Sequence, residues 1–502
     1  MLLLSGGWIY DGSGGEPWQG DLLIDGGRIA RLGKFAAPAC PVVDCAGLAV
    51  APGFIDLHSH SDLQALESRH GEKLRQGVTA EVVGNCGFSA FPQGSHAQEL
   101  CEFGGGILGR PAGWGWATAR EYLDAVQRSD GKVRALPLAG HGSLRVAVAG
   151  LRQGPLEEAE MDRLAGLAEA SLDAGCAGLS TGLMYAPGSS AGHGELLRLC
   201  RLVASRGKLY TTHMRSYAEG LLVALREQID LARESGCRLQ ISHLQAAGRA
   251  NWSLLGRALE EIEQARAEGI DVEFDIYPYQ CGSTVLTQWL PAWALDGGTG
   301  ELLKRLRDAG ARRRIAEATE AGRAQEWSDI TVSGVASAAN AVLVGRTVAE
   351  VAEARGVSGV EAALDLIAEE SAAVNVISFN QSEENLRRLL THPLCSVISD
   401  GFYVNGKPHP RLHGTFPELL GTVVRERGWM TLEEAVHKIT GKPAARLGLR
   451  GRGLLREGFA ADVTVFDASG VRSRATYETP ELPPVGIRLV IRDGEITMRG
   501  MQ

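Results

Sequence analysis

The sequence lacks any apolar run long enough to cross a bilayer, so we expect no membrane-spanning helix and no membrane partner. Its opening apolar stretch, MLLLSGG, is short and follows no basic residues, so we do not expect a secretion signal there. Clusters of basic charge are also missing: 51 Lys and Arg are scattered among 60 Asp and Glu, for a net charge of −9. This balance argues against nucleic acid as a partner.

Cysteine is too sparse and too irregularly spaced to form a disulfide framework. The nine cysteines are odd in number, which is typical of free thiols in a reducing compartment, and we expect a cytoplasmic location. The apolar fraction of 44% and the charged fraction of 22% are those of an ordinary globular protein. A length of 502 residues indicates either one large barrel with additions or two to three domains.

Both ends of the chain show the pattern of short antiparallel strands. Residues 1–52 contain DLLIDGGRIARLG and residues 450–502 contain IRLVIRDGEITMRG, in which apolar and polar residues alternate around Asp-Gly turns. Neither end has enough apolar surface to form a core by itself. We therefore predict that the two ends combine into one small β-sandwich domain.

Between the two ends, residues 53–449 alternate short apolar strands with amphipathic helices. The clearest helical spacing lies at 157–173, 192–206, 219–235 and 252–268. The strand candidates number eight and lie at 53–60, 78–86, 133–141, 176–182, 208–213, 238–243, 271–279 and 395–401. Eight successive strand-then-helix units predict an α/β fold, a (β/α)8 TIM-type barrel, with an open doubly wound sheet as the alternative.

One connection in this series is far longer than the others. More than a hundred residues separate the seventh strand candidate from the eighth, which exceeds an ordinary loop. Residues 282–345 contain STVLTQWLPAWALDGG and a charged helical run. We predict that this segment is an insertion after strand seven that stands over the mouth of the barrel.

Polar residues stand at the carboxyl ends of several predicted strands, where a barrel of this type places its active site. Strand one ends in His58 and His60, and their spacing puts both imidazoles on one face of the strand. Cys86 ends strand two within the motif GNCG. The further candidates, at the ends of strands five, six and eight, are His213, His243 and Asp400. Imidazole and thiolate together suit zinc, which takes tetrahedral nitrogen and sulfur ligands.

Each of these residues also has an ordinary structural explanation when it is considered alone. A strand-end histidine is more often a hydrogen-bonded residue than a ligand, and Cys86 could be a buried apolar thiol. Asp400 could cap the segment that follows it. The pair His58 and His60 could equally well bind one metal ion from the same strand or have a structural role. Because all the candidates fall at the same relative place in the barrel, the metal site is the better hypothesis.

Several longer motifs resemble one known family. They are APGFIDLHSHSD, GVTAEVVGNCGFS, THMRS, ISHLQAAG, DIYPYQCGSTVL, SDG and HPRLHGTFPE. The chain resembles the N-acyl-D-amino-acid deacylases, or D-aminoacylases, of the amidohydrolase superfamily, over nearly its whole length. The His-x-His motif is common to that superfamily, whereas GNCG and HPRxxGTFP are specific to the deacylase branch.

This resemblance implies how the metal ligands divide. Most superfamily members with two metals bridge them with a modified lysine on strand four, but strand four here, CAGLSTG, has no lysine. The deacylases instead use a cysteine on strand two. A tightly bound zinc is therefore expected on Cys86, His213 and His243. A second position, weakly occupied or empty, would be lined by His58, His60 and Asp400.

The resemblance also implies an activity, the hydrolysis of a small-molecule N-acyl-D-amino acid to a carboxylic acid and the free D-amino acid. Asp400 would be the acid/base, and Arg411 would bind the substrate α-carboxylate. Tyr277 and Ser283 match further positions that contact the substrate in the family. Gln245 stands where many relatives carry a carboxylate-binding lysine. We therefore expect neutral, hydrophobic side chains rather than D-glutamate or D-aspartate.

Two other functions remain compatible with a chain of this type. One is a cyclic-amide hydrolase of the hydantoinase or dihydroorotase kind, although those enzymes usually carry the lysine on strand four. The other is a non-catalytic homologue, although such proteins tend to lose metal ligands. The sequence does not predict the oligomeric state.

Overall fold

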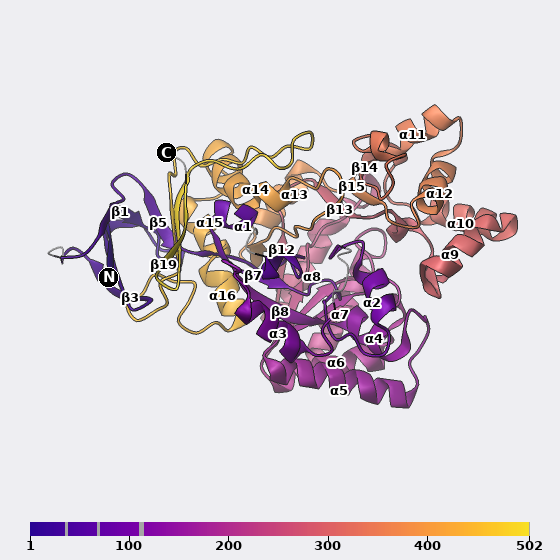
Figure 1. The fold of residues 1–502 in the computed structure, drawn as a ribbon, viewed down its shortest axis with the longest axis horizontal. Helices are drawn as coiled ribbons and strands as arrows, with labels where there is room; N and C mark the ends of the chain where they lie inside the picture. The colour runs from indigo at the N-terminus through magenta and orange to yellow at the C-terminus, as the bar shows by residue number, and fades with distance from the viewer. Residues whose placement is uncertain (36–38, 68–70, 110–114, 501–502) are drawn as a thin grey trace.

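In the computed structural model, which describes residues 1–35, 39–67, 71–109 and 115–500, a parallel barrel forms the centre of the molecule (Figure 1). Its eight strands are β6 (Phe54–Asp56), β7 (Val78–Val83), β8 (Arg134–Gly140), β9 (Gly178–Gly182), β10 (Leu209–His213), β11 (Arg238–Ile241), β12 (Val272–Ile276) and β16 (Cys395–Val397). A parallel bridge between Ser59 and Gly401 brings the ends of the first and eighth strands together. The predicted (β/α)8 barrel is confirmed, and each strand overlaps its predicted range.

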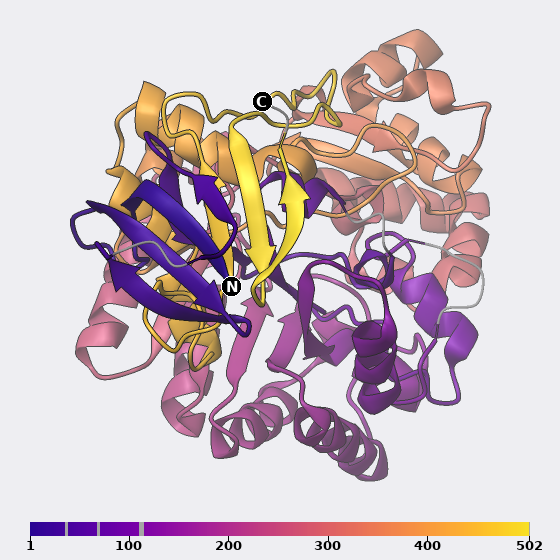
Figure 2. The same ribbon diagram turned by 60° about the vertical axis from the view of Figure 1, so that its left-hand side comes forward.

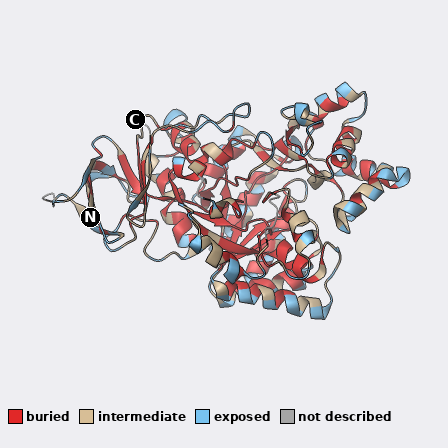
Figure 3. Ribbon diagram, in the orientation of Figure 1, coloured by how far each residue is buried: buried red, intermediate tan, exposed pale blue. Residues whose placement is uncertain are grey.

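Helices cover the outside of the barrel, with their exposed faces turned to solvent (Figure 3). They are α1 (Gly71–Arg75), α2 (Ala97–Gly104), α3 (Ala119–Arg128), α4 (His141–Ala149), α5 (Glu158–Ala174), α6 (His193–Ser205), α7 (Leu221–Ser235), α8 (Leu254–Ala267), α13 (Glu383–Thr391), α14 (Arg411–Glu418), α15 (Leu432–Lys438) and α16 (Gly441–Leu447). In α7, residues Leu221, Leu225 and Ile229 recur every four positions and are buried against the barrel. Among the described residues, no helix combines the length and the apolarity needed to cross a membrane.

Strands from the two ends of the chain form a second sheet, seen as indigo and yellow arrows in Figure 2. They are β1 (Leu2–Ile9), β2 (Trp18–Asp25), β3 (Arg28–Gly33), β4 (Val42–Asp44), β5 (Ala49–Pro52), β17 (Val463–Phe466), β18 (Ile487–Arg492) and β19 (Glu495–Arg499). The two ends meet where β17 pairs antiparallel with β5. One hydrophobic cluster contains residues of both ends, including Leu22, Ile24, Val463 and Ile491. Each end therefore depends on the other for its core.

The segment after strand seven forms a third sheet with its own helices, at the right of Figure 1. Its elements are β13 (Cys281–Val285), α9 (Gly298–Arg307), α10 (Ala309–Gly322), β14 (Ile330–Gly334), α11 (Val348–Arg355), α12 (Gly359–Glu369) and β15 (Asn375–Phe379). A separate hydrophobic cluster extends from Leu286 to Val376. Because β15 pairs with both β13 and β14, this sheet continues past residue 345, where the sequence suggested that the insertion ends. The division into domains stays a prediction.

Candidate metal centre

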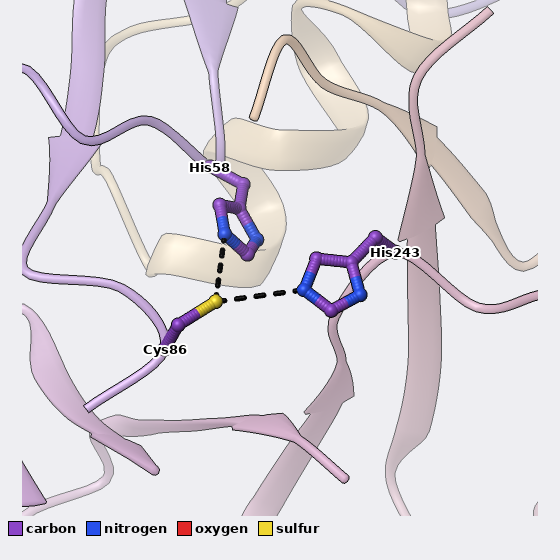
Figure 4. A group of neighbouring side chains, drawn as sticks. All are labelled: His58, Cys86 and His243. Atoms are coloured by element: carbon purple, nitrogen blue, oxygen red, sulfur yellow. Dashed lines mark hydrogen bonds between the residues drawn. The ribbon is translucent and has the colours of Figure 1, made fainter. Parts of the chain in front are cut away.

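The thiol of Cys86 points toward two imidazole rings (Figure 4). Its Sγ lies 3.3 Å from Nε2 of His58 and 3.5 Å from Nε2 of His243. These residues follow strands β7, β6 and β11, and all three are buried. The ligand atoms lie within 4.8 Å of one another, which is close enough for one ion to bind all three.

A second group of possible ligands lies directly beside the first and shares His58 with it. Oδ1 of Asp400 is 3.4 Å from Nε2 of His58 and 3.2 Å from Nε2 of His60. The backbone amide of Asp400 donates to the carbonyl of His58, and this bond fixes strand eight against strand one. Strand-end residues that are 340 positions apart in sequence are thus held within coordination distance.

His213 lies next to this pair of groups without belonging to either of the three-residue sets. Its ring centroid is 4.5 Å from that of His243 and 4.9 Å from that of Tyr185. Both ring nitrogens are buried and have no hydrogen-bond partner. A buried nitrogen of this kind costs free energy unless it finds a partner, and a metal ion would supply one.

The backbone at three of the candidate ligands has a positive φ. The values are 53° at Cys86, 36° at His243 and 48° at Asp400, in the left-handed region that non-glycine residues rarely adopt. Each such residue costs about 1–3 kcal/mol, and such strain is typical of functional sites. Strand four approaches the turn at Cys86 closely at Gly182. Glycine is required there, because an added Cβ would lie only 1.9 Å from the Cys86 carbonyl oxygen.

Burial keeps most of the imidazoles in their neutral, metal-binding form. It lowers the pKa of His213 to about 3, and it also lowers the pKa values of His60 and His243. Burial by itself would raise the pKa of Asp400, but the Arg411 guanidinium and His58 hold it well below its usual value. Burial alone would also lower the pKa of His58, but the charges of Cys86 and Asp400 outweigh it and raise that pKa instead. The site therefore offers the neutral nitrogens of His60, His213 and His243 together with a thiol and an ionised carboxylate, a donor set that fits zinc.

The predicted substrate-binding residues surround this centre. Arg411 is 1% exposed, its Nη1 lies 3.0 Å from Oδ2 of Asp400, and its guanidinium stacks 4.5 Å from the Tyr277 ring centroid. The hydroxyl of Ser283 donates to the Val376 carbonyl. Oε1 of Gln245 accepts a hydrogen bond from the Asn380 side chain. All four residues lie near the barrel mouth, and the side chains of Arg411, Ser283 and Gln245 are already engaged with protein partners.

A cavity of about 340 Å³ opens beside the metal ligands. We call it the main cavity. It reaches from the barrel mouth to the insertion, and its lining includes His60, Cys86, His213, Gln245, Tyr277, Ser283, Trp289, Leu290 and Asp400. The site is therefore open to a small molecule and covered on one side by the insertion.

Comparison with known proteins decides the family. A model of the amidohydrolase family matches residues 41–498. The chain belongs to the amidohydrolase family. This confirms the resemblance seen in the strand-end motifs.

Relatives within this family cover nearly the whole amidohydrolase chain. It is 37% identical over 98% of its length to an N-acyl-D-glutamate deacylase of Alcaligenes xylosoxydans xylosoxydans, 92% of which is covered. A D-aminoacylase of the same organism is 35% identical, over 98% of this chain and 93% of that one. A crystal structure of N-acyl-D-glutamate deacylase from Bordetella bronchiseptica, complexed with zinc and a phosphonate inhibitor, superimposes with a TM-score of 0.86 at 34% identity. That match covers 99% of this chain and 96% of the other.

Two charged residues that support the centre of this amidohydrolase were missed in the sequence. Asp275, on β12, lies 3.6 Å from Nδ1 of His58 and accepts a 2.7 Å hydrogen bond from the backbone amide of His243. Its signal was the second of two acidic residues in the buried strand VEFDI. Lys73 is completely buried beneath the site, where its Nζ lies 2.6 Å from Asp56. Nothing in the local sequence GEKLR distinguishes it from an exposed helical lysine.

Proposed function

We propose that this amidohydrolase uses zinc to hydrolyse linear N-acyl-D-amino acids to a carboxylic acid and the free D-amino acid, with a preference for neutral, hydrophobic side chains. The observation that carries this proposal is the thiol of Cys86 within 3.5 Å of the imidazoles of His58 and His243 at the barrel mouth. The named functions of the relatives support the same reaction class.

We propose that the tight zinc position is formed by Cys86, His213 and His243. The two unpartnered nitrogens of His213, next to His243, support this set. His58, His60 and Asp400 would line a second position. Zinc, when bound, acidifies a water molecule and polarises the substrate carbonyl, and a thiolate forms readily on such an ion.

Asp400 is the proposed acid/base. Its low pKa keeps the carboxylate ionised in the free protein, so it can accept the proton of the attacking water. It then passes a proton to the amine nitrogen as the amide bond breaks. The hydrogen-bonding distance from Oδ1 to His60 Nε2, 3.2 Å, holds the carboxylate in one orientation.

Arg411, with Tyr277 and Ser283, is proposed to bind the substrate α-carboxylate. A guanidinium has the planar geometry to hold both oxygens of a carboxylate. The Arg411 Nη2 donates to the Ser283 carbonyl at 3.4 Å, so strand β13 of the insertion contacts the same guanidinium. The substrate carboxylate would share Arg411 with Asp400, which keeps the reacting groups together.

The proposed preference for neutral side chains follows from the charges around the main cavity. Of its described lining residues, the charged ones are the carboxylates of Glu219 and Asp400. Arg411, which is paired with Asp400, is assigned to the α-carboxylate, so no further Lys or Arg of the described lining is left for an acidic side chain. Gln245, in place of a lysine, is neutral. Trp289 and Leu290 add apolar surface from the insertion. An acidic side chain would meet like charge here, whereas an apolar one would be buried favourably.

A substrate panel tests this function. The zinc-supplemented protein is assayed with the N-acetyl derivatives of D-leucine, D-methionine, D-glutamate and D-aspartate. The matching N-acetyl-L-amino acids and a hydantoin complete the panel. We expect D-leucine and D-methionine derivatives to be preferred over the acidic pair and over every L-isomer. A clear preference for the acidic pair contradicts the side-chain assignment. Hydrolysis of the hydantoin alone favours a cyclic-amide hydrolase, and a zinc-free, inactive protein favours the non-catalytic alternative.

We propose a cytoplasmic location, because the nine cysteines are all free thiols and most are buried. The proposed partner is the small-molecule substrate, which the main cavity could hold.

A further inference from the structure

A second cavity, of about 130 Å³, adjoins the main cavity. The residues that line both are Phe88, Ile107, Met184, Tyr185 and Gln288. We call the second space the far cavity. Its remaining lining comes from the loops after β7, β8 and β9 and from the insertion, and includes Phe103, Leu151, Val285, Leu295 and Leu302.

The far cavity lies across the barrel mouth from the proposed carboxylate-binding residues. In the order of the barrel sheet, β9 is the fourth strand and β16 the eighth, so they face each other in a closed eight-stranded ring. Met184 and Tyr185 follow β9, whereas Arg411 follows β16 and Tyr277 follows the neighbouring β12. Tyr185 is also close to the metal ligands, with its ring 4.9 Å from that of His213.

Strand β13 connects the two sides of the mouth. The backbone carbonyl of Ser283 accepts from Arg411, and the hydroxyl of Thr284 lies 3.2 Å from that of Tyr185. Val285 then lines the far cavity. Ser283 and Val285 are two strand positions, or roughly 7 Å, apart. A small extended molecule could therefore contact Arg411 at one end and the far cavity at the other.

The lining of the far cavity is mainly apolar, and no Lys or Arg is among its described residues. Phe88 stacks on Phe103 with ring centroids 4.6 Å apart, and aliphatic side chains from the insertion face them. The acidic residue of the described lining is Glu102, whose carboxylate already accepts a hydrogen bond from the backbone amide of Thr299. The space therefore suits an uncharged hydrocarbon group and disfavours a second carboxylate.

We propose that the far cavity binds the hydrocarbon tail of the acyl group, so that the preferred substrates carry acyl chains several carbons longer than acetyl. This inference rests on the proposed deacylase function. In an N-acyl amino acid the acyl tail and the α-carboxylate are at opposite ends, with the scissile amide between them. The amino-acid side chain instead branches from the carbon that carries the carboxylate. With the carboxylate on Arg411 and the amide at the metal ligands, the group that extends past the ligands toward Tyr185 is the acyl tail.

A chain-length series tests this proposal on the zinc-loaded protein. The value of kcat/KM is measured for N-acetyl-, N-butanoyl-, N-hexanoyl- and N-octanoyl-D-leucine. We expect it to rise by up to about fourfold for each methylene that becomes buried, and then to level off when the far cavity is full. Isothermal titration calorimetry gives an independent readout, in which octanoate binds at least about tenfold more tightly than acetate.

Two substitutions that fill the far cavity provide the structural test. Leu295→Trp and Leu151→Trp place a larger ring at partly buried positions that line the far cavity and not the main one. Either should bring the octanoyl-to-acetyl ratio of kcat/KM close to one and abolish the preference for octanoate. Leu197→Trp, at a partly buried position on α6 outside both cavities, is the matched control and should keep the wild-type ratio. Thermal melting confirms that each variant is folded.

The possible outcomes separate the two proposals. If N-acetyl-D-leucine is hydrolysed but longer chains give no gain, the acyl site is wrong and the deacylase function stands. If the tryptophan substitutions lower kcat/KM for substrates with large D-amino-acid side chains at constant acyl length, the far cavity binds the side chain and the proposal is overturned. If no member of the series is hydrolysed, the deacylase function fails and the acyl site fails with it.

Discussion

Cys86 differs from the other cysteines by its surroundings. Cys176 and Cys200 are equally buried, and burial raises the pKa of the Cys176 thiol to about 12. Cys86 is instead within 3.5 Å of two imidazole nitrogens and occupies a strained backbone turn. A purely apolar thiol would not need that conformation, so the strain and the neighbours together favour a ligand.

The substitution Cys86→Ala tests this assignment. We expect zinc content to fall well below that of the wild type, and kcat/KM to fall by at least about a hundredfold, because the proposed ligand set loses its thiolate. Elemental analysis and circular dichroism are the measurements. Cys176→Ala removes a buried thiol outside the site and should leave zinc content unchanged. Unchanged zinc in Cys86→Ala would contradict the assignment.

Asp400 is tested by replacement with asparagine. Asp400→Asn keeps the shape but removes the proton acceptor, so we expect kcat to fall by roughly 10²–10⁴-fold. Zinc at the position assigned to Cys86 should remain, as measured by elemental analysis. Asp162→Asn, at an exposed ion pair with Arg198, should change kcat little. Near-normal turnover in Asp400→Asn would mean that another group moves the proton.

At the scale of elements, a buried charge network holds strand ends together beneath the metal centre. Nζ of Lys73, on α1, lies 2.6 Å from Asp56 on β6, 3.6 Å from Glu81 on β7 and 2.8 Å from the hydroxyl of Ser399, just after β16. Asp56 and Glu81 are fully buried. Since His58 and Asp400 follow directly from these strand ends, the network fixes the spacing of these candidate ligands.

Removal of this cation should be severely destabilising. In Lys73→Met the two carboxylates remain buried without their lysine, so we expect a loss of about 3–5 kcal/mol in the free energy of unfolding. Chemical denaturation followed by tryptophan fluorescence measures it. Lys304→Met, whose side chain is 70% exposed, is the control and should cost less than about 0.5 kcal/mol. Equal stability of the two variants would show that the network contributes little.

At the scale of the whole molecule, a group of ion pairs connects the sheet of the chain ends to the barrel. Asp493, in the turn between β18 and β19, contacts Arg134 on β8 and Arg452. Partial burial alone would raise the pKa of Asp493, but these two arginines lower it below its usual value of 3.8. A carboxyl with a lowered pKa stabilises the fold above its usual pKa, and this stability is lost as the pH falls through the folded-state value.

The substitution Asp493→Asn should therefore have a pH-dependent effect. At pH 7 we expect a loss of about 0.5–1 kcal/mol, a small value because the side chain is partly exposed and screened by solvent. As the pH falls below 3.8, the usual value, toward the lowered pKa of the folded state, the wild-type carboxyl begins to be protonated, and the melting temperatures of wild type and variant should approach each other. Thermal melts from pH 3 to pH 7 measure the difference. A constant difference over this range would contradict the ion-pair explanation.

The sequence could predict the barrel because its signals are local. Strands such as 209–213 are short runs rich in Tyr and Thr, residues that favour strands, and end in a histidine. Helices such as 221–235 repeat apolar residues every three to four positions. The end of the insertion was harder to predict from the sequence, because the pairing of β15 with β13 joins segments about a hundred residues apart. No local pattern encodes such a pairing.

The alternation of strands and helices, the polar residues at the strand ends and the family motifs around them can all be inferred from the amino-acid sequence. Which of these residues meet depends on the folded chain. The fold places His58 and His243 within 3.5 Å of the Cys86 thiol, pairs Arg411 with Asp400, and buries Lys73 beside the carboxylate of Asp56. The physical reason is that periodicity depends on neighbours in the chain, whereas distances between ligands and the pairing of buried charges depend on how distant strands close into a ring.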